Sequence, residues 1–122
     1  MAALDIAFEV QEVSRQPRPS GGRPIDLVHL ARQTGGDKSL ESEVLALFAR
    51  QARQAVAQIG AVNGSARSDL AHRIAGAAKG VGASEVARCA SVLETEPGNS
   101  AAVAAFVRAV VEADTFIIGL TR

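Results

Sequence analysis

The sequence predicts an all-α fold, an antiparallel four-helix bundle with an additional short N-terminal helix. Of the 122 residues, 48% are apolar, yet Trp and Tyr are absent and only four Phe occur. The core must therefore consist mainly of Ala, Leu, Val and Ile, a mixture rich in the strongest helix former. Apolar residues also recur near helical period, and short stretches of Gly, Pro or Asn interrupt them.

The length of the chain suits one compact domain with one core and leaves no room for a second domain of ordinary size. We expect residues 1–24 to form an N-terminal arm and linker, and residues 25–122 to form the helical bundle. The start of the arm alternates apolar and polar residues, a pattern that suits a strand but also, less regularly, a helix. Residues 16–24 contain three Pro and two Gly, which oppose regular structure.

Two helices are predicted in the first half of the bundle. The first follows Asp26, whose side chain can cap it, and ends at Gly35–Gly36, where glycine permits a left-handed stop. The second begins at Asp37 or Ser39 and ends before Asn63–Gly64. The side chains predicted to form its core face are Leu40, Val44, Phe48, Ala55 and Ile59.

Three further helices are predicted in the second half. The third begins at Ser65 or Ser68 and is ended by Gly82, and the fourth begins at Ser84. The turn at 97–99, Pro-Gly-Asn, precedes the last helix. The apolar residues of this last helix are Val103, Phe106, Val110, Ile117 and Ile118.

The third predicted helix carries a histidine that points away from its core face. Its predicted core residues are Leu70, Ile74, Ala77 and Val81. At about 100° per residue, His72 lies about 200° from Leu70, on the opposite side of the helix. Ala75 and Gly76 are expected beside it on the exposed side, where their small size would let another protein approach the ring. Lys79 is expected on the same side, where it could meet negative charge.

An exposed neutral imidazole is a competent nucleophile at neutral pH. A glycine inside a helix lowers helix propensity by roughly 1 kcal/mol relative to alanine. A helix with Gly76 on its solvent face gains access to the His72 ring in return. The alternative is that His72 is an ordinary surface histidine that lies beside small residues by chance, since surface histidines are common.

Composition and charge exclude several classes of function. Thirteen basic residues balance thirteen acidic residues, so no positive field favours nucleic acid. The longest apolar stretch, near residues 101–107, is too short to span a membrane, and Asp5 and Glu9 do not suit a secretion signal. We therefore expect a soluble cytoplasmic protein with no nucleic-acid or membrane partner, and a monomer is the simplest expectation.

No metal site is predicted. The single cysteine, Cys89, has no Cys or His neighbour at metal-ligand spacing and is expected to be a small core residue. A bundle that binds a metal or cofactor through His29 and His72 is a third hypothesis, although no His or carboxylate lies three or four residues from His72. His29 is expected to be an ordinary exposed residue of the first helix.

The run AHRIAGAAKGVGA at residues 71–83 resembles the signature of the histidine phosphotransfer (HPt) domain family. In the family, this signature is a His, an apolar residue, Lys-Gly, small residues and then Gly-Ala. Residues 86–94 look like the helix that follows the signature, and residues 44–48 look like part of the helix that precedes it. Together the likeness covers roughly residues 25 to 118.

The resemblance implies an HPt-like bundle in which His72 is the phosphorylated nucleophile. Such a protein relays a phosphoryl group between receiver-domain aspartates of a two-component phosphorelay. The implied partners are response-regulator receiver domains and a hybrid or sensor histidine kinase. No cofactor is implied in this chain, because the receiver domain supplies the Mg²⁺. The protein would be a phosphoryl carrier and not an enzyme, and it has no Gly-rich nucleotide motif for autokinase activity.

One position departs from the family pattern. The family Gly corresponds to Gly76, but the Lys usually found three residues after the His is replaced here by Ala75. Lys79 and, less well oriented, Arg73 are the candidates to support the phosphate charge, and Ala75 and Gly76 are the candidates for receiver docking. The departure leaves open an alternative function, an HPt-like binding module that docks receiver domains without transferring phosphate.

Overall fold

The computed structural model describes residues 22–120, and the regular structure within this range is helical, with no strand. The helices are α3 (Leu27–Thr34), α4 (Lys38–Ile59), α5 (Gly64–Val81), α6 (Ser84–Thr95) and α7 (Ser100–Leu120). This confirms the all-α prediction for that range. Most of the predicted arm at residues 1–24 lies outside the described residues, as do residues 121 and 122.

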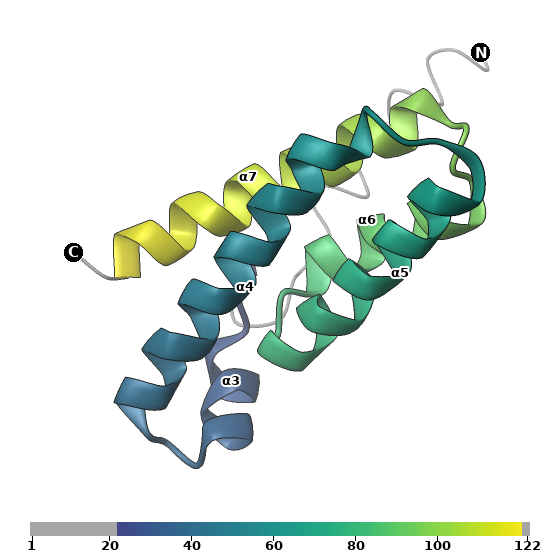
Figure 1. Cartoon of the computed structure of the whole chain (residues 1–122). Coiled ribbons are helices and arrows are strands. Elements are labelled where there is room, and N and C mark those ends of the chain that lie inside the picture. The colour runs from purple at the N-terminus through teal and green to yellow at the C-terminus, as the bar shows by residue number, and fades with distance from the viewer. Residues whose placement is uncertain (1–21, 121–122) are drawn as a thin grey trace, which may run out of the picture.

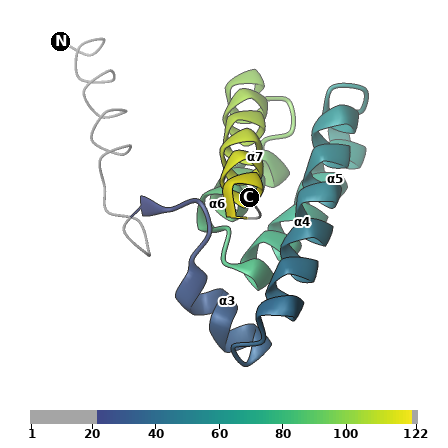
Figure 2. The ribbon, with the colours of Figure 1, turned by 90° about the vertical axis from the view of Figure 1, so that its left-hand side faces the viewer.

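The four longer helices run in alternating directions and are joined by short turns (Figure 1). Helix α5 packs against α4 and α6, and α7 packs against the same two helices from the other side. The shorter α3 packs against α4 and α5 and lies at the end of the molecule where α4 begins and α5 ends (Figure 2). Among residues 22–120, no polar or charged residue is fully buried.

The predicted signals at helix ends are mostly confirmed. Asp26 accepts hydrogen bonds from the backbone N–H groups of Val28 and His29, both at 3.1 Å, and so caps α3. Gly35 ends α3 in the left-handed conformation, with a φ of 65°. Asp37 caps α4 through the backbone N–H of Leu40. No helix of the described part of the chain has the length and apolar character needed to cross a membrane.

The predicted start of α5 is wrong. The helix begins at Gly64 after Asn63, and neither of the two predicted serines caps it. The Ser68 hydroxyl instead donates to the backbone carbonyl of Glu94 at 2.7 Å, which links α5 to α6. A serine in the first turn of a helix can cap that helix or bond to a neighbouring helix, and the local sequence does not distinguish the two.

Arg67 holds the two loops at this end of the molecule together. Its Nε donates to the carbonyls of Ile59 at 3.0 Å and Val62 at 2.9 Å, at the α4–α5 connection. Its Nη1 donates to the carbonyl of Pro97 at 2.7 Å, in the α6–α7 turn. Three charge-assisted bonds from one side chain therefore join the α4–α5 connection to the α6–α7 turn.

The core faces of α4 and α7 were predicted only in part. Phe48 and Ile59 of α4 are buried as expected, but Leu40 is 41% exposed. In α7, Phe106 is fully buried, whereas Ile118 is 45% exposed. The buried stripe of α4 includes residues that the sequence pattern left out: Leu45, Ala49 and Ala52.

Helix α5 buries a wider face than the sequence predicted. Leu70, Ile74 and Val81 are buried as expected. The buried face also includes three alanines, Ala71, Ala75 and Ala78, of which Ala71 and Ala78 have no exposed area. The most extensive helix pairing in the described chain is that of α5 with α6. Alanine has almost no side chain, so it lets two helices approach closely along this side.

Candidate functional site

His72 lies on the exposed side of α5, and its side chain is 73% exposed. This confirms the prediction that the ring points away from the core. The neighbouring Leu70, Ile74 and Val81 face inward and hold the helix against the rest of the molecule. The ring is therefore carried on a packed helix but remains accessible to a second protein.

The imidazole of His72 is oriented by a carboxylate from the next helix. Its Nδ1 lies 2.9 Å from Oε2 of Glu94, which is on α6, 22 residues further along the chain. A carboxylate accepts hydrogen bonds and a neutral imidazole carries one N–H, so we infer that the proton is on Nδ1. The lone pair of the neutral ring is then on Nε2, the nitrogen that makes no hydrogen bond to another described residue.

Glu94 is itself held in place. Its side chain is 34% exposed, and its backbone carbonyl accepts the hydrogen bond from Ser68 described above. Ser68 and His72 are four residues apart on α5, so the two bonds join successive turns of α5 to the same residue of α6. The arrangement of histidine, orienting carboxylate and supporting bond resembles the pattern that prepares a histidine for nucleophilic or acid–base chemistry.

The surface beside His72 has little side-chain cover. Gly76, one turn along α5, is exposed, and a Cβ added to it would meet no atom within 4 Å. Gly80, one further turn along, is equally open. A strip without side chains therefore runs along α5 from His72 to Gly80, since residues four apart in a helix lie on one face. The exposed position of Gly76 agrees with the prediction.

The exposed position predicted for Ala75 is wrong. Ala75 is only 4% exposed and belongs to the buried face that packs near α6. The helical wheel misplaced it because alanine fits a core or a surface equally well, and the leucine, isoleucine and valine residues alone set the predicted core direction. Ala75 therefore offers almost no surface for docking, and the accessible small residues are Gly76 and Gly80.

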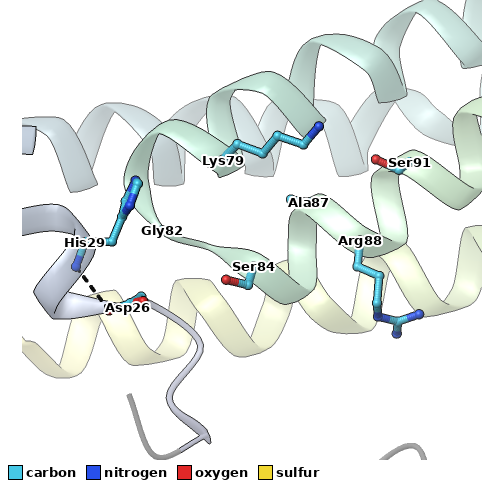
Figure 3. Close-up of a pocket in the computed structure, with 8 residues that line it drawn as sticks. All are labelled: Asp26, His29, Lys79, Gly82, Ser84, Ala87, Arg88 and Ser91. Carbon is cyan, nitrogen blue, oxygen red and sulfur yellow. Dashed lines mark hydrogen bonds between the residues drawn. The ribbon is translucent and has the colours of Figure 1, made fainter. Parts of the chain in front are cut away.

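The two candidate cations, Arg73 and Lys79, are both exposed. Neither forms a hydrogen bond or ion pair with another residue in the range 22–120. In Figure 3 the Lys79 side chain extends back along α5, away from Gly82, and its ammonium and the Ser91 hydroxyl of α6 point toward one another. Lys79 therefore lies on the same face of α5 as His72, nearly two turns further along.

A pocket of about 360 Å³ lies where α3, the end of α5 and the start of α6 meet. Lys79 contributes a cationic group to its lining, and Ser84 and Ser91 contribute hydroxyls. Arg88 also borders the pocket, but its guanidinium turns away from Lys79 (Figure 3). The sequence did not predict this pocket, because its residues come from three helices and share no spacing pattern. Figure 3 shows these residues around the opening.

His29 also lines this pocket, and the prediction that it is an ordinary exposed residue is wrong. It is partly buried, and a Cβ added to Gly82 would lie only 3.2 Å from its Cδ2 atom. The glycine at position 82 thus makes room for the ring. Its Nε2 is the one buried side-chain nitrogen or oxygen of the described chain that lacks a hydrogen-bond partner.

Cys89 is buried in α6, in agreement with its predicted place in the core. Burial raises the pKa of its thiol, although the nearby Arg88 acts in the opposite direction. A buried thiol with a raised pKa carries little thiolate and is a poor nucleophile. Within residues 22–120, no three His, Cys, Asp or Glu side chains are grouped so that they could hold a metal ion.

The sequence analysis did not single out Glu94 as a site residue. A usable signal exists: His72 and Glu94 lie eleven residues on either side of Ala83, one of the two residues between α5 and α6. When the two helices fold back on each other about that residue, the two side chains lie at the same position along the helix pair. The signal requires knowledge that the helices are paired and antiparallel, which spacing within one helix does not provide.

No family model matches the chain, and no curated protein or solved structure gives a significant match. The functional interpretation therefore depends on the motif at residues 71–83 and on the geometry around His72.

Proposed function

We propose that this protein is a histidine-containing phosphotransfer protein that carries a phosphoryl group on His72 between receiver-domain aspartates of a two-component phosphorelay. The observation that carries the proposal is the exposed imidazole whose Nδ1 contacts Glu94 at 2.9 Å. Because the carboxylate can only accept a hydrogen bond, a neutral His72 ring donates from Nδ1 and has its lone pair on Nε2, on the helix that carries the open strip at Gly76 and Gly80.

In this proposal, Nε2 of His72 attacks the phosphorus of an aspartyl phosphate on a docked receiver domain. A P–N bond forms, the P–O bond to the aspartate breaks, and the aspartate leaves as a carboxylate. The proton on Nδ1 stays in the hydrogen bond to Glu94, where the carboxylate stabilises the positive charge that the ring gains. The reverse reaction with a second receiver returns the ring to its neutral state.

Positioning and charge neutralisation dominate reactions of this kind, and the receiver domain brings the Mg²⁺ and most of the catalytic groups. The chain's own contribution is a prepared nucleophile, an accessible surface and a nearby positive charge. Lys79 is the candidate for that charge, because it is exposed on the same face of α5 as His72 and no described residue neutralises it. Arg73 is the second candidate.

The arrangement of the longer helices is compatible with an HPt-like four-helix bundle, in which the second helix carries the histidine and α3 is the additional short helix. As a carrier, the protein would be phosphorylated by a hybrid or sensor histidine kinase through a receiver domain, and it would act in the cytoplasm, where such partners operate. It would have no autokinase activity of its own.

The test is transfer of labelled phosphate from phosphorylated receiver domains to this protein. We expect acid-labile label on the wild-type chain and none on the variant His72→Gln, which keeps a polar side chain but lacks the nucleophile. The chain contains only two histidines, so His29→Gln is the matched control and should accept label normally. Label that persists in His72→Gln, or that disappears in His29→Gln alone, would contradict the site assignment.

Docking without transfer is the alternative function, and the position of Ala75 favours it. The family Lys is replaced here by a buried alanine, and within residues 22–120 no lysine or arginine makes a hydrogen bond to the His72 ring. If the wild-type protein binds phosphorylated receivers but never acquires label, the docking-only function replaces the carrier function. Calorimetric titration with the same receiver domains separates the two outcomes.

A further inference from the structure

The pocket at the α3–α5–α6 junction contains hydrogen-bond donors, and of these the proposed phosphotransfer reaction uses only Lys79 (Figure 3). Lys79 stands on one side of it, and the hydroxyls of Ser84 and Ser91 stand on the α6 side. These three side chains make no hydrogen bond or ion pair with other residues of the described range. They are therefore available to a ligand.

The other charged groups of the pocket are already compensated. Arg88 donates to both carboxylate oxygens of Glu85, at 3.1 and 2.6 Å, and in Figure 3 its guanidinium turns away from Lys79. The Asp26 carboxylate accepts two backbone N–H groups at the N-terminus of α3, where the helix dipole favours negative charge. The uncompensated charge in the pocket is thus the positive charge of Lys79.

His29 lies at the edge of the pocket, but its Nε2 has almost no accessible surface, so an oxygen in the pocket does not reach it. The groups open to a ligand are the Lys79 ammonium and the Ser91 hydroxyl, which point toward one another (Figure 3). A group with oxygen acceptors and negative charge would serve both together.

From this geometry we propose that the pocket binds an oxyanion, a phosphate or a carboxylate group, held between the Lys79 ammonium and the Ser91 hydroxyl. A volume of about 360 Å³ is at the small end of ligand pockets, which suits one anionic group with a few further atoms. Lysine binds such groups as a point charge, and serine hydroxyls donate to their oxygens. The proposal does not depend on phosphoryl transfer by His72.

The test is a titration of the ¹⁵N-labelled full chain with inorganic phosphate at constant ionic strength, followed by NMR. We expect saturable shifts of the backbone signals of Lys79 and Ser91, with a dissociation constant in the millimolar range, on the order of 1 mM. A parallel titration with acetate tells whether the site accepts carboxylates or only phosphate; saturation by either anion at these signals supports the proposal.

Lys79→Ala should weaken phosphate binding about fivefold or more, the effect of about 1 kcal/mol. The matched control is Arg50→Ala, which removes an exposed cation from α4, outside the pocket, and should leave binding unchanged. His72→Gln should also bind phosphate normally, so failure of the phosphorelay would not remove this site. Shifts that never saturate with either anion, or equal weakening by Lys79→Ala and Arg50→Ala, would overturn the proposal.

Discussion

Two glycines in the C-terminal half of α5 and at its end, Gly76 and Gly82, differ in how much space the fold leaves for a side chain. Gly82 ends α5 with a φ of 81°, and a Cβ added there would lie 2.9 Å from the backbone oxygen of Asp26. Its own carbonyl accepts a hydrogen bond from the backbone N–H of Asp26 at 2.8 Å. Gly76 is inside the helix, and an added Cβ there would meet nothing within 4 Å.

The comparison shows that the fold requires glycine at position 82 but not at position 76. A left-handed residue in close contact with α3 cannot easily carry a side chain, whereas an exposed helical residue can. Glycine inside a helix lowers the free energy of unfolding by about 1 kcal/mol relative to alanine. Within the described chain, nothing at Gly76 requires the absence of a side chain. Close approach of a partner to His72 would account for it.

The largest effect is expected from Gly82→Ala. Left-handed backbone strain alone costs about 1–3 kcal/mol in the free energy of unfolding, and the contact with the Asp26 carbonyl adds to it. Urea denaturation followed by circular dichroism measures the change. A variant as stable as the wild type would show that the junction between α3 and α5 can shift, and the contrast with Gly76 would then be lost.

Ala75→Leu should also destabilise the protein, by about 1–3 kcal/mol, because position 75 is buried and a larger side chain overfills the core near α6. The same denaturation measurement applies. This variant sharpens the comparison, since the adjacent Gly76 should accept a leucine without such a loss. An unchanged free energy of unfolding would indicate that position 75 is exposed, as the sequence predicted.

Gly76→Ala should stabilise the protein by about 1 kcal/mol, because it improves helix propensity and creates no close contact. Gly76→Leu should also fold, but its branched side chain would block the approach to His72 and strongly weaken receiver binding in calorimetry. Ala at this position is the control for helix propensity. Equal receiver affinity of the wild type and the leucine variant would show that the open strip is incidental.

The smallest effect is expected from Lys79→Ala. Position 79 is exposed, so the unfolding free energy should hardly change. Transfer to and from His72 should slow by a few-fold, since an exposed charge interaction is worth about 0.2–1 kcal/mol. Single-turnover transfer kinetics with a phosphorylated receiver domain provide the measurement, and Arg73→Ala tests the second cation. An unaltered transfer rate in both variants would show that the receiver domain alone stabilises the phosphate charge.

Local signals in the sequence predicted the helix ends well. Asp26, Asp37 and Gly82 act within one turn of the chain, so their effect on the backbone does not depend on distant contacts. The exposed position of His72 was also predictable, because the nearby Leu70 and Ile74 define the inward direction of the helix.

The parts that sequence could not predict are those that depend on helix pairing. Alanine carries no clear preference for core or surface, so the burial of Ala75 became visible only with α6 in place. Ser68 could cap its own helix or bond to α6, and it does the second. The contact between His72 and Glu94, like the pocket around Lys79, depends on the register of two helices and not on a spacing within either one.

Because His72 of α5 donates a hydrogen bond to Glu94 of α6, the pairing of these two helices determines which ring nitrogen carries the proton. An isolated α5 peptide would contain the same imidazole, but its proton would exchange between the two nitrogens without a neighbouring carboxylate to favour one. Local opening of α6 away from α5 would release the ring in the same way. The side-chain ¹⁵N shifts of His72 would therefore report, in the intact protein, how often this pair of helices separates.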